Sequence, residues 1–332
     1  MIRVLRPGLQ TSVQDQGRYG LQHIGLCPGG AMDPVALSLA NALVGNPVTE
    51  AALEITVIGP ELEFESETLV AVCGAEFAGS FPHPPGTLPQ SRPVLVPAGG
   101  RINLGRASRG ARAYLAVAGG FDLAPVLGSR STYIPGAFGG FKGRALRHGD
   151  ALPLKADSLE LSRERFGRLK RKRERSVPWS APSHTLADRE PILVHVLEGQ
   201  HFADFDANVQ RAFFDTVWRV ASDSNRMGFR LAGPHLARTA TDEILSGPTC
   251  LGTVQVPANG APIALMADHQ TTGGYPKIAE IASADVPRLA QLAPGGQVHF
   301  AKCSLEMAAE LRKHTREAVQ AQLRGIAWEY GN

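Results

Sequence analysis

Cysteines, aromatic residues and long apolar runs are all scarce in this sequence, and each shortage excludes a class of protein. The 332 residues include four cysteines, and aromatic residues make up 6% of the chain. The cysteines form no C-x-x-C pair, so we expect no zinc or other bound metal. No apolar run approaches the ~20 residues that a membrane-spanning helix needs, and no secretory signal is recognisable. We therefore expect a cytoplasmic protein with reduced thiols and no membrane contact.

Several nucleotide-binding and catalytic signatures are missing as well. The sequence has no P-loop, no G-x-G-x-x-G between a strand and a helix, no G-x-S-x-G elbow and no H-E-x-x-H pair. It also has no Met-Lys dipeptide, so biotin is not expected to be attached to this chain. A reaction that needs ATP or tethered biotin would therefore depend on a partner protein.

Charge is nearly balanced overall but concentrated in one place. The formal net charge is +3, whereas the segment 163–175, RERFGRLKRKRER, alone carries eight basic and two acidic residues. A nucleic-acid-binding domain spreads positive charge over a whole face, so we expect no nucleic-acid partner. Two interpretations of this basic segment stay open. It is either a solvated helix or linker, or a surface that docks onto an acidic partner.

Glycine and proline are abundant, and they separate short apolar segments. The 36 glycines and 24 prolines follow no period, and β-type alternation recurs between them, as in the segments 52–65 and 191–199. In the first of these, Leu53 and Ile55 are expected to face the core while Glu54 faces away. This spacing is typical of barrels or sandwiches and predicts a mainly β protein with a few helices.

A shift in composition suggests where the domains end. The segment 158–190 combines the basic run with a stretch rich in proline and serine. The sequence therefore predicts four regions, which are a first β domain over 1–157, a linker over 158–190, a second β domain over 191–303 and a C-terminal helix over 304–332. Within the first domain, Asp33 as cap, Pro34 at the first position and Gly45 after the end predict one helix.

Two polar segments stand out in the first half because they crowd small and charged residues around glycines. In the segment 11–20, Asp15 and Arg18 are expected to pair locally. In the segment 128–132, Ser129 and Arg130 are candidates for binding an anion through backbone N–H groups and the guanidinium. The alternatives are a self-bonded polar turn for the first segment and a turn with a surface arginine for the second.

Two further polar segments lie in the second half. In the segment 222–231, an extended strand would place Arg226 and Arg230 on one face, where two guanidinium groups can hold a carboxylate. The alternative is that each arginine pairs with a nearby acid such as Asp223 or Asp242. The segment 267–276 follows an apolar strand, which is a common place for a binding site.

Three residues of this last segment are candidate catalytic residues. Asp268 is a candidate general base or acceptor of a substrate N–H, and Gln270 and Thr271 are candidates for binding an amide or carbonyl group. The alternative is a structural turn with an Asx cap.

An ordered set of motifs is similar to the allophanate hydrolase subunit 2 family, whose members are also called KipA-like proteins or the C subunit of 5-oxoprolinase. The matching segments cover roughly residues 3–300 and read TSVQDQGRYG, CPGGAMDPVALSLANALVGN, ALEITVIGPELEF, GSRSTYIPGAFGGFKGRAL, SNRMGFRLAG, SGPTCLGTVQVP and DHQTTGGYPKIA. The resemblance implies two cyclophilin-like β-barrel domains. It also implies partners, namely the KipI-like and the LamB/YcsF-like components of 5-oxoprolinase.

The resemblance further implies an activity on a small amide. The assembled bacterial 5-oxoprolinase uses ATP to open 5-oxo-L-proline to L-glutamate, and this chain is expected to be inactive alone. Related domains transfer a carboxyl group from carboxybiotin to urea. Those members have a lysine in the segment that matches IASADVPRL, whereas in this sequence the segment has Ser283 and no lysine. Carboxyl transfer to urea or a related amide, and non-catalytic antagonism of a KipI-type protein, stay open as alternatives.

Carried over to this chain, the resemblance and the residue chemistry predict one set of site residues. The expected catalytic residues are Asp268, Gln270 and Thr271. The expected substrate-binding residues are Asn225, Arg226, Arg230, Gln255, Ser129 and Arg130.

Overall fold

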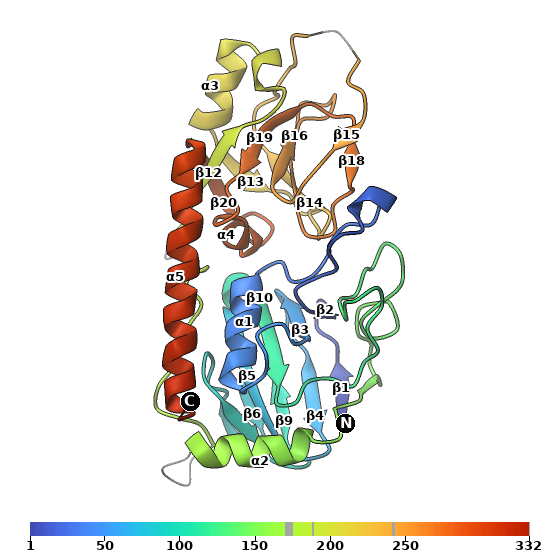
Figure 1. Cartoon of the computed structure of the whole chain (residues 1–332), viewed down its shortest axis with the longest axis vertical. Helices are drawn as coiled ribbons and strands as arrows, with labels where there is room; N and C mark the ends of the chain where they lie inside the picture. The colour runs from blue at the N-terminus through green and yellow to red at the C-terminus, as the bar shows by residue number, and fades with distance from the viewer. Residues whose placement is uncertain (170–174, 188, 241–242, 332) are drawn as a thin grey trace. The chain divides into compact units, whose positions relative to one another are not determined.

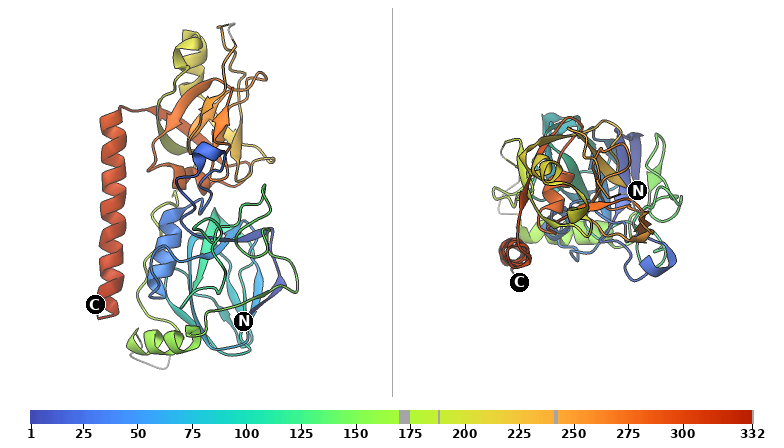
Figure 2. Two further views of the ribbon diagram at one scale, coloured as in Figure 1. Left: turned by 45° about the vertical axis from the view of Figure 1, so that its right-hand side comes forward. Right: turned by 90° about the horizontal axis from the view of Figure 1, so that it is seen from above.

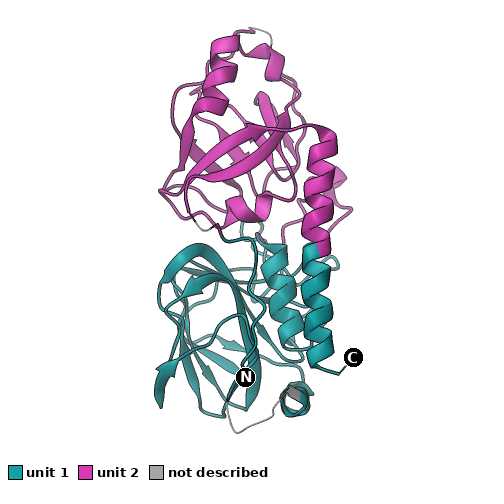
Figure 3. Ribbon diagram, turned by 90° about the vertical axis from the view of Figure 1, so that its left-hand side faces the viewer, with its two compact units in different colours: residues 1–18, 33–186, 318–332 teal, residues 19–32, 187–317 magenta. Residues whose placement is uncertain are grey.

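The computed structural model describes residues 1–169, 175–187, 189–240 and 243–331. These residues form two compact units, coloured separately in Figure 3. Unit 1 contains residues 1–18, 33–186 and 318–332, and unit 2 contains residues 19–32 and 187–317. Part of the basic segment, residues 170–174, lies outside the described residues, so the choice between a solvated linker and a docking surface stays open.

Unit 1 is built on two β-sheets (Figure 1). The six-stranded sheet has the order β11 (Ala151–Leu152), β1 (Ile2–Arg6), β4 (Glu61–Phe64), β9 (Arg101–Asn103), β6 (Ser80–Pro82) and β7 (Pro85–Thr87). The five-stranded sheet has the order β2 (Gln10–Gln14), β3 (Ala52–Thr56), β10 (Ala107–Val117), β5 (Thr68–Phe77) and β8 (Val94–Val96). Apolar side chains from both sheets pack into one core that includes Phe64, Val72 and Leu115.

Helix α1 (Pro34–Leu43) packs against β5 and β10 of unit 1. Asp33 caps its N-terminus by accepting a hydrogen bond from the Ala36 backbone nitrogen at 3.0 Å. Gly45 follows its end with a φ of 70°, a left-handed conformation that glycine adopts without strain. The predicted helix and both of its end signals are confirmed.

Strand β3 differs from its predicted role. Its alternating pattern predicts a half-buried strand with Glu54 on the polar face, but Glu54 is only 1% exposed. The prediction was wrong because β3 lies between β2 and β10 inside the sheet and is covered on both faces. Glu54 is instead satisfied by Tyr114 on β10, whose hydroxyl donates to the Glu54 carboxylate at 2.7 Å.

Unit 2 contains a closed barrel of seven strands. Figure 2 shows the ribbon of the chain from two further directions. Its strands in order are β12 (Ile192–Glu198), β19 (Lys277–Ile281), β16 (Thr253–Gln255), β17 (Ile263–Leu265), β14 (Gly228–Ala232), β13 (Val217–Val220) and β20 (Gln297–Lys302). The pair β12–β20 is parallel, and the other pairs are antiparallel. Trp218, fully buried, and Val254 belong to the barrel core. The predicted mainly β fold with barrel architecture is confirmed.

The remaining elements are short strands and helices. A separate two-stranded ribbon pairs β15 (Gly247–Pro248) with β18 (Thr272–Gly273). The other helices are α2 (Ser158–Leu169), α3 (Ala207–Asp215), α4 (Val286–Ala290), α5 (Leu305–Glu329) and the short 3₁₀ turns η1 (Gln22–Ile24) and η2 (Phe202–Asp204). Helix α2 falls inside the segment predicted to be a linker. Among the described residues, no helix has both the length and the apolar character that crossing a bilayer requires.

Candidate functional site

A polar layer lies on the side of β16 and β19 that faces away from the barrel core. Val254 points into the core of unit 2, whereas its neighbours Thr253 and Gln255 carry polar side chains and are still buried. Thr253 pairs with Glu280 of β19, and Gln255 pairs with Lys277. A β-bulge interrupts this register, so that Ile278 packs in the core while Lys277 lies opposite Gln255.

Gln255 is held by another predicted site residue. The Gln270 side-chain nitrogen donates to Gln255 Oε1 at 2.9 Å. Gln255 is 1% exposed, and its own Nε2 has no hydrogen-bond acceptor within the described part of the chain. The backbone carbonyls of Gln270 and Thr271 accept from Thr249, which fixes this loop beside Gln255. The structure thus brings three of the predicted residues together, with one buried amide donor left over.

Lys277 is the cation of this polar layer. It is 5% exposed, and its ammonium group donates to the Pro248 carbonyl at 2.7 Å and to Gln200 Oε1 at 3.4 Å. Both acceptors are neutral. Sequence reasoning missed Lys277, because the segment we singled out ended at Pro276. A lysine and a glutamate within a short strand of otherwise apolar residues, KIAEI, were the available signal.

Glu280 and Cys250 form the other end of the layer. Thr253 donates its hydroxyl to Glu280 Oε2 at 2.8 Å, and Cys250 Sγ lies 3.3 Å from the same oxygen. Burial raises the pKa of Glu280 above its ordinary value, although the Thr253 and Cys250 hydrogen bonds and the Lys277 charge oppose the shift. Burial also raises the pKa of the Cys250 thiol, so this cysteine is no activated nucleophile.

Arg226 and Asp268 form a buried ion pair in unit 2. Arg226 Nε and Nη2 donate to the two Asp268 oxygens, each at 2.9 Å, and the side chains are 4% and 1% exposed. Arg226 Nη2 also donates to the Gly30 carbonyl at 2.6 Å. The Asp268 backbone nitrogen donates to the Arg226 carbonyl at 2.8 Å, which sets the two residues opposite each other beyond the β14–β17 ladder. This pair fixes both predicted site residues in one geometry.

Arg230 and Asn225 have a different setting from Arg226. The strand expected to carry both arginines begins only at Gly228, so Arg226 lies in the preceding bend. Arg230 is exposed and pairs with Asp223 at 2.9 Å, which is the alternative we had left open. Asn225 is also exposed, and its side-chain oxygen accepts from the Met227 nitrogen at 2.8 Å. Asp242 lies outside the described residues.

Ser129 and Arg130 belong to unit 1, where their loop surrounds an aspartate. The Ser129 and Ser131 hydroxyls each donate to Asp15 Oδ1 at 2.6 Å, and the Arg130 backbone nitrogen donates to Asp15 Oδ2 at 2.5 Å. The Gly17 nitrogen adds a fourth bond at 2.8 Å. The loop therefore does collect donors around an anion, as its composition suggested, but that anion is the carboxylate of Asp15.

Two arginine side chains around the Asp15 carboxylate donate hydrogen bonds to backbone carbonyls. Arg18, expected to pair with Asp15, donates to the Ser131 carbonyl at 2.5 Å and lies 5.0 Å from the centre of the Phe138 ring. The Arg130 side chain donates to the Leu123 carbonyl at 2.7 Å.

Among the described residues, no group of three or more His, Cys, Asp or Glu side chains is arranged to hold a metal ion.

Each unit has a pocket of its own. In unit 2, a pocket of about 370 Å³ is lined by residues that include Leu236, Val256, Gly274, Tyr275 and Pro276. Val256 follows Gln255, and Pro276 precedes Lys277, so this pocket adjoins the polar layer.

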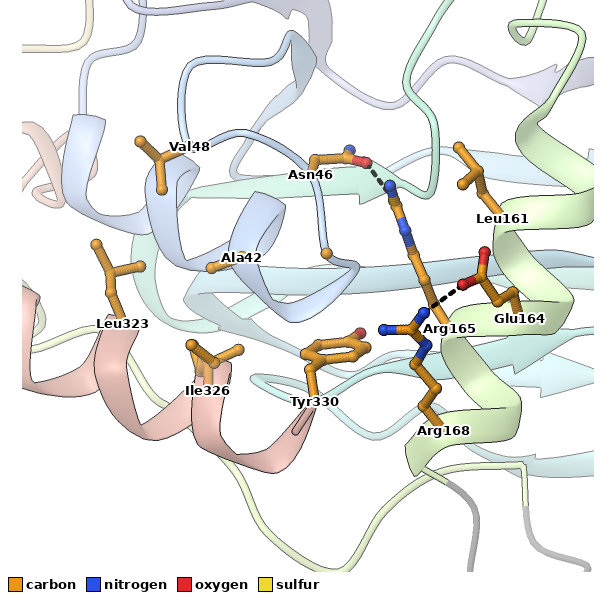
Figure 4. Close-up of a pocket in the computed structure, with 12 residues that line it drawn as sticks. Ala42, Asn46, Val48, Leu161, Glu164, Arg165, Arg168, Leu323, Ile326 and Tyr330 are labelled. Atoms are coloured by element: carbon orange, nitrogen blue, oxygen red, sulfur yellow. Dashed lines mark hydrogen bonds and ion pairs between the residues drawn. The ribbon is translucent and has the colours of Figure 1, made fainter. Parts of the chain in front are cut away.

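The pocket of unit 1, of about 430 Å³, is shown in Figure 4. There Arg165 points towards Asn46 and donates to Asn46 Oδ1 and the Val44 carbonyl, each at 2.9 Å. These contacts satisfy the end of helix α1, which gives Arg165 a structural role.

Comparison with known proteins shows which family has this architecture. Residues 24–302 match the family model described as carboxyltransferase domain, subdomain A and B. The chain is 39% identical to the C subunit of 5-oxoprolinase from Escherichia coli, with 100% of this chain and 99% of that protein covered. It is 35% identical to the protein of the same name in Haemophilus influenzae, with 99% of each covered.

A solved structure agrees with these sequence matches. The Kluyveromyces lactis urea amidolyase has a TM-score of 0.85 and 32% identity to this chain, and the match covers 97% of this chain. The chain spans only 20% of that protein's length, whereas it spans almost all of the two bacterial relatives. The chain therefore belongs to the carboxyltransferase domain, subdomain A and B, family, which it shares with the C subunit of 5-oxoprolinase and with part of urea amidolyase.

Proposed function

We propose that this chain is the C subunit of an ATP-dependent 5-oxoprolinase, which opens 5-oxo-L-proline to L-glutamate together with partner proteins. The observation that carries the proposal is the end-to-end match to two proteins of that name, at 39% and 35% identity. The proposed partners are the KipI-like and the LamB/YcsF-like components of the same enzyme. The cytoplasm is the proposed compartment, and the chain is proposed to be inactive alone.

The polar groups of unit 2 fit the chemistry of a lactam. Asp268 is ion-paired with Arg226, and a carboxylate oxygen can accept the N–H of a ring amide. Gln270 and Thr271 lie in the same loop and are proposed to bind the lactam carbonyl, where negative charge develops as the amide is attacked. Gln255 supplies a buried amide donor beside them.

The other predicted site residues fall into two groups, according to their burial and to the hydrogen bonds and ion pairs that they already form. Arg226 and Ser129 are buried and bonded to Asp268 and Asp15, so we assign them to positioning. Asn225, Arg130 and Arg230 are at least partly exposed and keep the proposed role of contacting substrate.

ATP belongs to the assembled complex in this proposal. The donors of the 128–132 loop are occupied by Asp15, so this loop does not fit a phosphate, and no step through ATP is assigned to this chain. Biotin is not attached here, because the sequence lacks the Met-Lys dipeptide.

The test is reconstitution. The chain is co-expressed with candidate KipI-like and LamB/YcsF-like partners, and glutamate release from 5-oxoproline is measured with and without ATP. We expect ATP-dependent release by the complex, no release by the chain alone, and a large loss of kcat in the Asp268→Asn complex. A wild-type complex that assembles but releases no glutamate would refute the proposal, and full activity of Asp268→Asn would remove that residue's role.

One observation favours a second candidate, a biotin-dependent carboxyltransferase acting on urea or a related amide. It is the TM-score of 0.85 to a urea amidolyase over 97% of this chain. This candidate predicts consumption of carboxybiotin when the chain is coupled to a biotin carboxylase and given urea. The same preparation distinguishes the two activities, because only the first one releases glutamate.

A further inference from the structure

A cross-strand pair of hydrogen-bond donors lies beneath a pair of glycines in unit 2. Lys277 and Gln255 are register partners on β19 and β16, and Gly247 and Gly273 are register partners in the β15–β18 ribbon. A Cβ atom added to Gly273 would lie 2.6 Å from Gln255 Nε2, and one added to Gly247 would lie 3.5 Å from Lys277 Nζ. The ribbon therefore covers both donors, and a side chain at Gly273 would force the Gln255 amide to move.

The two donors are poorly matched by what surrounds them. Burying a charged group is costly unless an opposite charge or several hydrogen bonds compensate. Lys277 donates hydrogen bonds to the Pro248 carbonyl and Gln200 Oε1, both neutral, and its charge also acts on Glu280 at the other end of the polar layer. Gln255 Nε2 has no acceptor among the described residues. An ammonium group and an amide N–H side by side suit one ligand group in particular, a carboxylate with two acceptor oxygens.

The arginines of unit 2 nearest to the predicted site are already paired. Arg226 is bonded to Asp268, Arg230 to Asp223, and Arg238, which lines the adjoining pocket, to Asp204. Using Arg226 or Arg238 to bind a substrate carboxylate would mean breaking an ion pair that is largely buried. Lys277 needs no such exchange, because a carboxylate would replace a neutral carbonyl.

The adjoining pocket provides room for the rest of the ligand. Its walls include Val256, Tyr275 and Pro276, which are apolar and suit a small aliphatic ring. Gly274, next to the ribbon residue Gly273, belongs to the same lining. Lys277 and Gln255 are not among its lining residues, so a ligand would reach both donors only once the four-residue ribbon moves aside.

We infer that Lys277 and Gln255 form a carboxylate-binding subsite, in which the carboxylate of a small lactam acid replaces the Pro248 carbonyl as the β15–β18 ribbon lifts. This inference rests on the proposed function for its choice of substrate. It makes Lys277 the residue that distinguishes 5-oxoproline from a lactam without a carboxylate.

The test compares two ligands that differ only in the carboxylate. Binding of 5-oxoproline and of 2-pyrrolidinone is measured by titration calorimetry or ligand-detected NMR, on the full chain and on the assembled complex. In the wild type, 5-oxoproline should bind more tightly. In Lys277→Met its affinity should fall by about 10- to 100-fold, the range expected for one charged hydrogen bond. The affinity for 2-pyrrolidinone should not change, and Lys277→Arg should restore part of the preference.

Controls separate recognition from folding. Lys302→Met removes an exposed lysine of β20 that pairs with Glu198 and should leave both affinities unchanged. Gly273→Ala should weaken 5-oxoproline binding, because its methyl group would displace the Gln255 amide. The inference is overturned if Lys277→Met melts like the wild type and keeps the preference for 5-oxoproline. It is equally overturned if Lys277→Met is unstable while Lys277→Arg folds but binds both ligands equally tightly.

Combining the binding and glutamate-release measurements separates this inference from the proposed function. If the complex releases no glutamate yet 5-oxoproline binds in a Lys277-dependent way, the proposed function fails and the subsite stands. If glutamate is released and KM for 5-oxoproline is the same in Lys277→Met, the subsite fails and the function stands. Binding of inorganic phosphate but not of 5-oxoproline to the wild-type chain would also overturn the carboxylate assignment.

Discussion

Two regions differ in how far they satisfy a buried charged group. One is the loop 128–132 of unit 1 around Asp15, called here the Asp15 loop, and the other is the polar layer of unit 2 around Lys277, called here the Lys277 layer. Asp15 receives four hydrogen bonds from its own chain, and both of its carboxylate oxygens are used. Lys277 has two neutral acceptors, one of them at 3.4 Å, beside an amide donor that has none among the described residues. Both groups are largely shielded from solvent, at 8% and 5% exposure.

This difference shows how a structural polar cluster is told apart from a candidate binding site. The composition of the two regions is similar, with small polar residues and glycines in each. What separates them is how completely the chain itself satisfies the hydrogen-bonding groups of the buried side chains. The Asp15 loop is complete without a ligand, whereas the Lys277 layer has donors that a carboxylate would complete.

The largest expected effect comes from breaking a completed charge pair in unit 2. Arg226→Met leaves Asp268 as a buried carboxylate without its cation, so we expect a loss of about 3–5 kcal/mol in the free energy of unfolding. Denaturant titration of the full chain measures it. The double variant Arg226→Met/Asp268→Leu should recover part of that loss, since neither charge then stays unpaired. If the single and double variants are equally stable, the pair is not the completed cluster described here.

A smaller loss is expected at the Asp15 loop. Asp15→Asn keeps the shape of the side chain but replaces an acceptor oxygen with an NH₂ group facing donors. We expect a loss of about 1–3 kcal/mol in stability, the cost of leaving a buried polar group unsatisfied. Asp122→Asn, at an exposed aspartate of the same unit, is the control and should change little. A neutral result for Asp15→Asn would contradict the view that this loop is built around its own carboxylate.

The smallest effect is the pH dependence at Glu280. Burial raises the pKa of this carboxyl in the folded protein, so the folded state is penalised above that pKa and gains stability as pH falls through it. Glu280→Gln removes the titration. The variant should therefore be more stable than the wild type at neutral and higher pH, with the difference shrinking as pH falls. Thermal melts from about pH 4 to about pH 8 would show it, with Glu198→Gln as a control at an exposed carboxylate. A difference that grows on acidification would reverse the sign and reject this account.

Local signals predicted part of the fold. The ends of α1 follow from neighbouring residues, because Asp33, Pro34 and Gly45 act within a turn of where they stand. Glu54 was misplaced because its burial depends on Tyr114, 60 residues away in the chain. Alternation along one strand shows that two faces differ, but not what covers each face.

The candidate site was harder to predict for the same reason. Asp15 meets Ser129 across 114 residues, and Arg226 meets Asp268 across 42. Each residue was singled out correctly as unusual, yet the sequence alone did not show that they satisfy one another. Lys277 was missed because its position opposite Gln255 depends on a β-bulge, and no residue pattern in β16 or β19 marks where the register shifts.

The parallel pairing of β12 with β20 has a consequence for how unit 2 is made. Ile192 lies opposite Val298, so the first strand of the barrel pairs with the last one. The barrel can therefore close only after β20 has been synthesised. Until then β12 has an unpaired edge, whose backbone N–H and C=O groups can pair with strands of other chains. Truncation before β20 should therefore yield an aggregating product rather than a smaller barrel.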